Sequence, residues 1–257
     1  MRVIAIANHK GGVGKTTSVI NLGAALARSG KRVCLIDLDA QMNLTQSFNV
    51  KWGGESVADR LLRPDEASYI PKKIKDSLWV LPADKQLASL ETKTFTRNRN
   101  LLLKDLVVKP MEENRDLDFD YILLDTPPSL GLLTINAFTA ANEVFIPMTA
   151  QPLSLSGART LLDAIDNVRE KANPALHLSG VFITMYDQRQ TIQRRMADLI
   201  SSTFKETMFQ TRIGNNVTLI EATAARSDVF QYGEKSRGAK DYESLCQEVL
   251  KQEETMK

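Results

Sequence analysis

Cysteine is scarce in this sequence, and long apolar runs are missing from it. The two cysteines, Cys34 and Cys246, form no C-x-x-C pair, which excludes a disulfide framework and the clustered thiolates of an iron–sulfur carrier. No apolar run approaches the roughly 20 residues of a membrane-spanning helix. The last turns, "YESLCQEVLKQEETMK", are too acidic for a basic membrane-binding helix. We therefore expect a soluble, cytoplasmic protein with two buried thiols and no membrane partner.

An excess of one charge sign is also missing. Lys and Arg number 33 against 31 Asp and Glu, for a net charge of +2, so composition neither demands nor forbids a nucleic-acid partner. Any basic surface must be local. With 257 residues, 43% of them hydrophobic, the chain can bury a sizeable core, and we expect one α/β domain over 1–257.

Short apolar runs alternate with longer helical patterns along the chain, which is typical of β-α-β units. Most of the runs are continuously apolar, as expected for strands covered on both faces, so we predict a mostly parallel central sheet flanked by helices on both faces. The polar stretch Lys51–Lys75 is predicted to be a mobile insertion. The predicted strands are Val3–Ala7, Val33–Asp37, Leu78–Pro82, Tyr121–Asp125, Val144–Met148 and Gly180–Met185, and the clearest helices are Thr17–Ser29, Asn98–Val108, Ser156–Lys171 and Gln190–Phe204.

The first strand leads into "ANHKGGVGKTT", which fits the phosphate-loop pattern G-x-x-x-x-G-K-[ST] except that His9 replaces the first glycine. Backbone N–H groups there can converge on phosphate oxygens at a helix N-terminus. Lys15 would neutralise the β- and γ-phosphates, the Thr16 hydroxyl would bind Mg²⁺, and Thr17 would lie near the α-phosphate. The predicted nucleotide-binding residues of the loop are Lys10, Gly11, Gly12, Val13, Gly14, Lys15, Thr16 and Thr17.

Three aspartates follow apolar strands in "VCLIDLDAQ" and "YILLDTPPSLG", which places carboxylates at the carboxyl edge of the sheet beside the loop. Asp125 is the predicted carboxylate of the Mg²⁺ shell, and Asp37 could hold that shell from the neighbouring strand. Asp39 is better placed to orient water against the γ-phosphate. A single strand-end aspartate is often only a cap, but three around one phosphate loop favour a metal–nucleotide site.

Together these segments resemble the ParA/Soj family of partition ATPases, whose phosphate loop reads K-G-G-x-G-K-T and is followed by a D-x-D-x-Q element. Lys10–Thr16, Asp37–Gln41 and Asp125–Gly131 match that pattern, and the similarity continues through "LLTINAFTAANEVFIPM", "GVFITMYDQRQ" and "SRGAKDYESLCQEV". The resemblance implies a P-loop ATPase that uses ATP and Mg²⁺. It also implies that Lys10 reaches the phosphates of a second subunit in an ATP sandwich dimer, with Gly12 at the close approach of the two loops. Lys10, Lys15 and Asp39 are then the catalytic residues.

The chain departs from the family in "TRIGNNVTLIEATAARSD", where Gly214, Asn215 and Thr218 replace a proline and two arginines. By resemblance, Met185, Ile213 and Gly214 contact the adenine. The family's DNA-contacting surface loses the two arginines but keeps Arg189, and Arg194 and Arg195 follow about one helical turn later. Between residues 186 and 240, nine Lys/Arg face six Asp/Glu, an excess of three that a solvated helix face explains equally well.

The resemblance implies an ATP-switched partition protein: an ATP-bound homodimer binds nucleoid DNA nonspecifically, and a ParB-like partner on a plasmid or chromosome triggers slow hydrolysis. Within the family, a protein cargo or a MinD-like membrane role are the alternatives, and the acidic C-terminus argues against the second. From other classes, a metabolic P-loop ligase would leave Lys10 unexplained, and an iron–sulfur carrier would need clustered cysteines.

Overall fold

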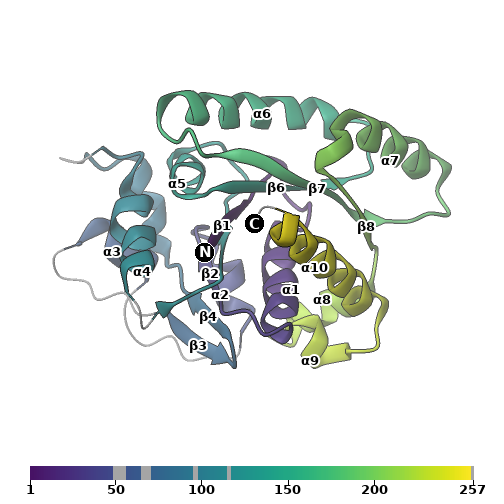
Figure 1. The fold of residues 1–257 in the computed structure, drawn as a ribbon, viewed down its shortest axis with the longest axis horizontal. Coiled ribbons are helices and arrows are strands. Elements are labelled where there is room, and N and C mark those ends of the chain that lie inside the picture. The colour runs from purple at the N-terminus through teal and green to yellow at the C-terminus, as the bar shows by residue number, and fades with distance from the viewer. Residues whose placement is uncertain (49–55, 65–70, 95–97, 115–116, 256–257) are drawn as a thin grey trace.

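The computed structural model describes residues 1–48, 56–64, 71–94, 98–114 and 117–255. These residues form one eight-stranded sheet with the order β3-β4-β2-β5-β1-β6-β7-β8 (Figure 1). Neighbouring strands are parallel, except that β3 and β4 are antiparallel. The strands are β1 (Arg2–Ile6), β2 (Val33–Asp37), β3 (Lys72–Lys75), β4 (Leu78–Leu81), β5 (Tyr121–Asp125), β6 (Glu143–Thr149), β7 (His177–Tyr186) and β8 (Met208–Gly214).

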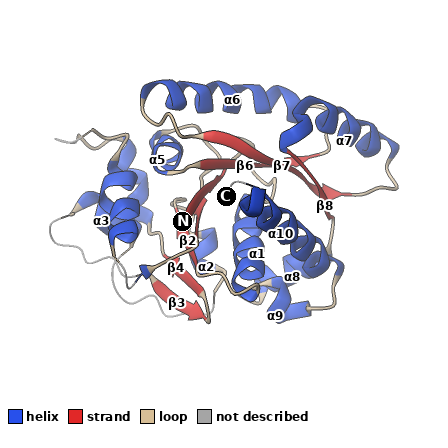
Figure 2. Cartoon of the chain, in the orientation of Figure 1, coloured by secondary structure: helices blue, strands red, loops and turns tan. Residues whose placement is uncertain are grey.

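Helices cover both faces of the sheet (Figure 2), because alternate residues of each buried strand point to opposite sides. Ile4 and Ile6 of β1 belong to the core cluster shared with α1 (Lys15–Arg28), α9 (Val229–Gly233) and α10 (Arg237–Thr255). Val3 and Ala5 belong to the cluster shared with α5 (Leu132–Ala140), α6 (Ser154–Lys171) and α7 (Thr191–Phe204). The predicted α/β class, with helices on both faces of a mostly parallel sheet, is confirmed.

Shorter elements complete the described chain, and several of them lie in connections between strands. They are α2 (Asn43–Gln46), α3 (Val57–Leu62), α4 (Lys109–Glu113), α8 (Val217–Ala224), the 3₁₀ turns η1 (Lys85–Glu91) and η4 (Lys205–Thr207), and the π-helical turn η2 (Lys104–Val108). None of the described helices is long and apolar enough to cross a membrane. Cys34 and Cys246 are both buried free thiols, as predicted.

All six predicted strands are present, with bounds that differ by at most three residues. The two strands that were not predicted, β3 and β8, lie at the two edges of the sheet. β3 reads KKIK, and β8 carries exposed or half-exposed polar residues from 210 to 212, so neither shows the continuous apolar run of a strand covered on both faces.

Three of the four predicted helices match α1, α6 and α7 within two residues. The helix predicted over Asn98–Val108 is confirmed only in part: residues 98–101 are not helical, and 102–108 are helical mostly with π-type geometry. The segment begins with a turn, continues as the π-helical turn η2 and then becomes the α-helix α4. Pro110 has no N–H to donate to the carbonyl of Leu106, four residues earlier. That carbonyl instead accepts a hydrogen bond of 3.0 Å from Arg60 Nε, so a distant side chain completes the irregular turn.

The predicted insertion Lys51–Lys75 lies partly outside the described residues, which omit 49–55 and 65–70. Its described part is ordered into secondary structure. Ser56 caps α3 through a reciprocal hydrogen-bond pair with Asp59, and β3 pairs with β4 at the edge of the sheet. Val57–Leu62 and Lys72–Lys75 thus form regular secondary structure within the predicted insertion, and its mobility stays a prediction.

Candidate nucleotide-binding site

The phosphate loop connects the end of β1 to the start of α1, as its sequence predicts. Gly12 and Gly14 have φ angles of 70° and 85°, a region that favours glycine. Within the single chain, no atom lies within 4 Å of a Cβ built on Gly12, so its need for glycine here comes from the backbone conformation. Gly14 stands at the N-cap of α1 without a side-chain cap, which leaves the positive end of the helix facing the loop.

Lys15 opens α1 and is only 7% exposed. Its Nζ lies 3.3 Å from the carbonyl oxygen of Lys10, to which it donates a hydrogen bond. Burial lowers the pKa of Lys15, and the nearby carboxylates of Asp125 and Asp39 oppose that effect. The ammonium is thus a largely desolvated cation inside the loop, ready to meet an anionic ligand.

Lys10 lies at the mouth of the loop, and its ammonium has a different partner. Lys10 Nζ donates to Gln151 Oε1 at 2.7 Å, in the connection between β6 and α6, while its backbone N–H is bound by Asn8 Oδ1. The two lysines of the loop therefore have separate roles in the single chain. The ring of His9 packs on α6, where a Cβ at Gly157 would come within 2.4 Å of His9 Cε1.

The strand register brings two predicted metal residues to the same edge. Asp37 of β2 and Asp125 of β5 are direct partners across the ladder, and Ile6 at the end of β1 pairs with Asp125 on its other side. Both aspartates are fully buried beside the phosphate loop. Because like charges so close together repel, this pair stores an unfavourable interaction at the carboxyl end of the sheet.

Asp125 has both carboxylate oxygens buried without a hydrogen-bond partner among the described residues. Burial raises the pKa of Asp125 well above its ordinary value, and Asp37 raises it further. Thr16 and Lys15 oppose that rise. A buried carboxylate beside a hydroxyl supplies hard oxygen donors of the kind that Mg²⁺ prefers, so the residues present fit the metal.

Asp37 uses its oxygens within the chain. Asp37 Oδ2 accepts from the backbone N–H and the hydroxyl of Thr45, at 2.8 and 2.7 Å, and Oδ1 accepts from Asp39 N–H at 3.0 Å. Burial raises the pKa of Asp37 to about 6 despite these bonds. Asp39, further out, accepts from the backbone N–H of Gln41 at 2.9 Å. Asp37 thus anchors α2 and fixes the turn that carries Asp39.

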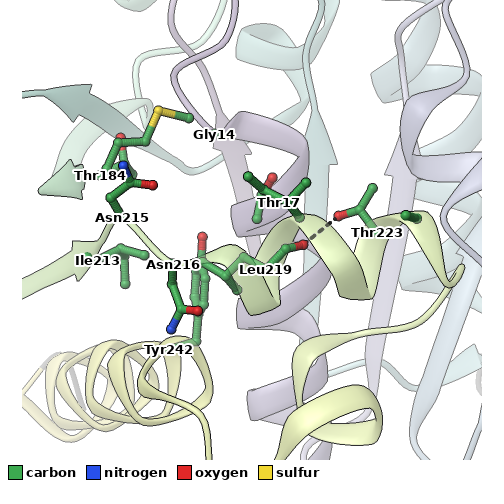
Figure 3. Close-up of a pocket in the computed structure, with 13 residues that line it drawn as sticks. Gly14, Thr17, Thr184, Ile213, Asn215, Asn216, Leu219, Thr223 and Tyr242 are labelled. Atoms are coloured by element: carbon green, nitrogen blue, oxygen red, sulfur yellow. Dashed lines mark hydrogen bonds between the residues drawn. The ribbon is translucent and has the colours of Figure 1, made fainter.

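A mostly apolar pocket of about 410 Å³ opens beside the loop, between α1, α8 and the ends of β7 and β8 (Figure 3). It contains all three residues that were expected at the adenine: Met185, Ile213 and Gly214. Sequence reasoning missed the rest of the wall, because these residues lie in β7, the β8–α8 connection, α8 and α10 and were not tied to the site by a motif. The additional lining residues are Thr184, Asn215, Asn216, Leu219, Ile220, Thr223, Ala224 and Tyr242.

The floor of the pocket connects it to the phosphate loop. Gly14 and Thr17 line it from the loop side, and the Tyr242 hydroxyl lies 3.0 Å from the hydroxyl of Ser18 in α1. A flat apolar group in this pocket would sit next to phosphates held at the helix N-terminus. The geometry therefore suits one ligand with an aromatic base at one end and a polyphosphate at the other.

Comparison with known proteins identifies the family to which the chain belongs. Residues 1–178 match the family model described as "AAA domain". The chain is 37% identical to the chromosome partitioning protein ParA of Caulobacter vibrioides, covering 98% of this chain and 95% of the relative. It is 38% identical to the sporulation initiation inhibitor protein Soj of Bacillus subtilis, covering 96% and 98%. The chain belongs to the ParA/Soj family of partition ATPases.

A solved structure from a differently named relative shares the fold of this ParA/Soj chain. Cobyrinic acid a,c-diamide synthase from Mycobacterium smegmatis, with bound ADP and magnesium, is 33% identical, with a TM-score of 0.83 over 100% of this chain and 97% of its own. The likeness supports nucleotide and Mg²⁺ binding in proteins of this fold. Its name also identifies a second function class for comparison.

The arginines that resemble the ParA/Soj DNA surface lie at the start of α7, beyond the end of β7. Arg189 forms two hydrogen bonds with the Asp187 carboxylate, both at 2.9 Å, so its guanidinium is paired although its side chain is 87% exposed. Arg194 donates to the carbonyl of Gln188 at 2.9 Å. Arg195 is the third predicted residue and also belongs to α7. The three lie close together in the chain, on a segment adjoining the pocket residue Met185.

Proposed function

We propose that this chain is an ATP-switched partition protein, folded as one domain over 1–257, that dimerises around ATP, binds DNA in that state and releases it on hydrolysis. One observation carries the proposal. A buried lysine, a buried carboxylate with no hydrogen-bond partner among the described residues, and an uncapped helix N-terminus converge beside a pocket that suits a base. Each of these features is unfavourable in isolation, and a nucleoside triphosphate with a divalent cation would compensate all three.

Within the site, we assign roles by position. The amides from Gly11 to Thr16 hold phosphate oxygens, Lys15 faces the β- and γ-phosphates, and Thr17 lies near the α-phosphate. Mg²⁺ would be held by Thr16 and Asp125. Asp37 would support the metal shell through the turn that it anchors. When bound, the cation supplies charge neutralisation between the β- and γ-phosphates. Asp39, at the more exposed end of its turn, orients a water molecule toward the γ-phosphate.

Lys10 carries the dimer part of the proposal. Lys15 already occupies the interior of the loop, and a second ammonium beside it would be repelled. Lys10 instead lies at the mouth, bound to Gln151 by a hydrogen bond between exposed groups that water can replace. We infer that Lys10 leaves Gln151 to reach the phosphates of a second copy. Hydrolysis by the dimer is slow alone and faster with a ParB-like adaptor on the cargo.

Light scattering of the full chain with ATP and Mg²⁺ tests this dimer. Wild type should dimerise with ATP and remain monomeric with ADP. Lys10→Ala should bind ATP and stay monomeric, whereas Lys171→Ala, a lysine at the far end of α6, should behave as wild type. Asp39→Ala should form a stable dimer that hydrolyses ATP poorly. ATP-dependent dimerisation of Lys10→Ala to the wild-type extent would refute the role in trans.

DNA is the proposed surface on which the ATP state assembles, which would associate the protein with the nucleoid. Arg189, Arg194 and Arg195 would contact phosphates, and a dimer would double the patch. With four to six such contacts in the dimer, log K should fall with log salt at a slope of about −0.9 per contact. Random duplex titrated with ATP and with ADP checks this: Arg189→Ala should weaken binding, and Arg194→Ala/Arg195→Ala should weaken it further. Failure to bind at low salt with ATP would favour a protein cargo or a membrane surface.

A ligase is the candidate from another class, because the Mycobacterium smegmatis relative is named as a synthase. Two observations favour partition. The relatives named ParA and Soj are 37% and 38% identical, against 33% for the synthase, and Lys10 has no evident task in a monomeric ligase. The same scattering experiment separates the two, since a ligase has no reason to dimerise with ATP.

A further inference from the structure

One solvent-exposed carboxamide at the rim of the nucleotide pocket has neither its oxygen nor its nitrogen in a hydrogen bond in the part of the chain that the structure describes. The Asn215 carboxamide lines the pocket at the end of β8, and no hydrogen bond engages its side-chain oxygen or nitrogen. Figure 3 places it on the side of Thr184, away from Thr223. The amide therefore offers one acceptor and one two-hydrogen donor to whatever fills the pocket.

The other polar groups of the pocket offer less to the edge of a base. Asn216 caps α8, because its side-chain oxygen accepts from Thr218 N–H at 2.9 Å. The Thr223 hydroxyl donates to the carbonyl of Leu219 at 3.0 Å within the same helix, and the Thr17 hydroxyl lies on the side of the phosphate loop. Among the described residues of the pocket, Asn215 is thus the carboxamide whose oxygen and nitrogen are both free.

The backbone on both sides of the Asn215 side chain is fixed by contacts particular to this chain. Gly214 N–H donates to Asp241 Oδ2 of α10 at 2.8 Å, a bond that a proline at 214 could not make. Asn215 N–H donates to the carbonyl of Tyr186 at 3.1 Å. A Cβ at Gly214 would lie 2.9 Å from Arg237 Cζ, so the guanidinium covers the space that a side chain would take. The segment is therefore held before any ligand arrives.

The chemistry of a carboxamide selects between purines. On its N7 edge, adenine places the N6 amino donor next to the N7 acceptor, and an asparagine side chain matches this pair with two hydrogen bonds. The same edge of guanine carries two acceptors, N7 and O6, so in either orientation the amide can make only one of the two bonds. A site built to hydrogen-bond one edge rejects an analogue that leaves its groups unpaired.

We propose that Asn215 is the residue that selects adenine over guanine in this pocket. The proposal rests on the proposed ATP site and adds its base specificity. The determinant occupies a position where the family pattern has an arginine, so it belongs to this chain and not to the shared loop motifs. Met185, Ile213 and Leu219 supply the apolar faces between which the base would lie.

Calorimetric titration of the full chain with ATP and with GTP tests the proposal. Asn215→Ala should lower ATP affinity about tenfold, the value of one to two net hydrogen bonds, and bring the ATP:GTP ratio toward one. Asn215→Asp should weaken ATP binding, because a carboxylate cannot donate to N7, and should weaken GTP binding more, because O6 and N7 of guanine are both acceptors. Thr203→Val is the matched control: its hydroxyl donates to the carbonyl of Leu199 at 2.8 Å within α7, away from the pocket, and its ratio should equal that of wild type.

Two outcomes contradict different claims. If wild type binds ATP, Lys15→Ala abolishes that binding, and Asn215→Ala keeps the wild-type ATP:GTP ratio, the role of Asn215 is wrong while the ATP site stands. If wild type binds no nucleotide, the proposed function fails and the base specificity with it. Thermal unfolding of each variant without nucleotide separates lost recognition from lost folding.

Discussion

At the amino end of the sheet, Arg2 of β1 and Glu143 of β6 form a double hydrogen bond of 2.7 and 2.6 Å. Ser179 donates a third bond to Glu143 at 2.6 Å, and Arg2 also donates to the carbonyl of Val249 in α10 at 2.9 Å. At the carboxyl end of the same sheet, Asp125 is as deeply buried and has no hydrogen-bond partner among the described residues.

The difference between the two ends lies in whether the protein's own residues neutralise the buried charges. The charges at the amino end are neutralised within the chain, where they tie the last helix to the sheet. Those at the carboxyl end, Asp37 and Asp125 with Lys15, are gathered but left only partly compensated. A site that must bind and release a charged ligand has to keep its groups available, at a cost in stability that a structural network avoids.

Breaking the pair of Arg2 and Glu143 should have the largest effect, and this effect is on the free energy of unfolding. Glu143→Ala leaves the guanidinium of Arg2 buried beside an empty space, so the free energy of unfolding should fall by about 3–5 kcal/mol. Urea denaturation followed by circular dichroism measures it. Asp166→Ala, which removes an exposed ion pair with Arg169 on α6, should change stability little. Equal losses in the two variants would contradict the importance of the buried pair.

Removing the cation of the phosphate loop should have the next largest effect, but on binding. Lys15→Ala loses a charge-assisted contact to the phosphates, which should weaken ATP affinity by about 2–3 kcal/mol, or roughly 30- to 150-fold. Stability without nucleotide should stay the same or rise, because a desolvated ammonium is removed. Calorimetry measures the affinity. Lys31→Ala is the control, because Lys31 lies between α1 and β2, at the opposite end of α1 from the phosphate loop. Unchanged ATP affinity would exclude Lys15 from the site.

Removing the unpartnered charge at the carboxyl end should stabilise the protein. Asp125→Asn abolishes the repulsion with Asp37 and the burial of a charge, so the nucleotide-free protein should gain about 1–2 kcal/mol. Asp163→Asn on the exposed face of α6 should change nothing measurable. Urea denaturation without nucleotide compares them, and a loss of stability in Asp125→Asn would mean that the carboxylate is structurally needed.

The pH dependence of stability should have opposite signs at the two ends. Burial would raise the pKa of Glu143, but the hydrogen bonds from Arg2 and Ser179 outweigh it and lower that pKa. Its stabilisation is therefore present above the ordinary glutamate pKa and lost as pH falls through the lowered value. Glu143→Gln should flatten this acid limb in urea denaturation measured as a function of pH.

Asp37 behaves in the reverse way. Because burial raises its pKa to about 6, the folded state binds more protons than the unfolded state between about pH 4 and 6, and stability falls as pH rises through that window. Asp37→Asn should reduce this fall, leaving the part that comes from the raised pKa of Asp125 and the acid limb of Glu143 in place. A pH profile of Asp37→Asn that matches wild type between pH 4 and 6 would contradict the raised pKa.

The sequence predicted the phosphate-loop side of the site because glycine, lysine and strand-end aspartate act through local geometry. The loop follows its strand, and parallel pairing alone brings Asp37 next to Asp125. The features that the sequence could not predict depend on contacts between residues that are far apart in the chain. Arg60 reaches the carbonyl freed by Pro110, and β8 becomes a strand through pairing with β7 although its exposed face is polar. Asn215 and Tyr242 enter the pocket only after α8 and α10 are packed.

The most direct test of the central claim, that the carboxyl end is left incomplete for Mg²⁺ and ATP, is the thermal midpoint with ATP, with and without Mg²⁺. In wild type, Mg²⁺ should add several degrees to the shift produced by ATP alone, because the cation meets the free oxygens of Asp125. In Asp125→Asn this added shift should largely disappear while the shift from ATP alone remains. An equal Mg²⁺-dependent increment in the two proteins would contradict the account.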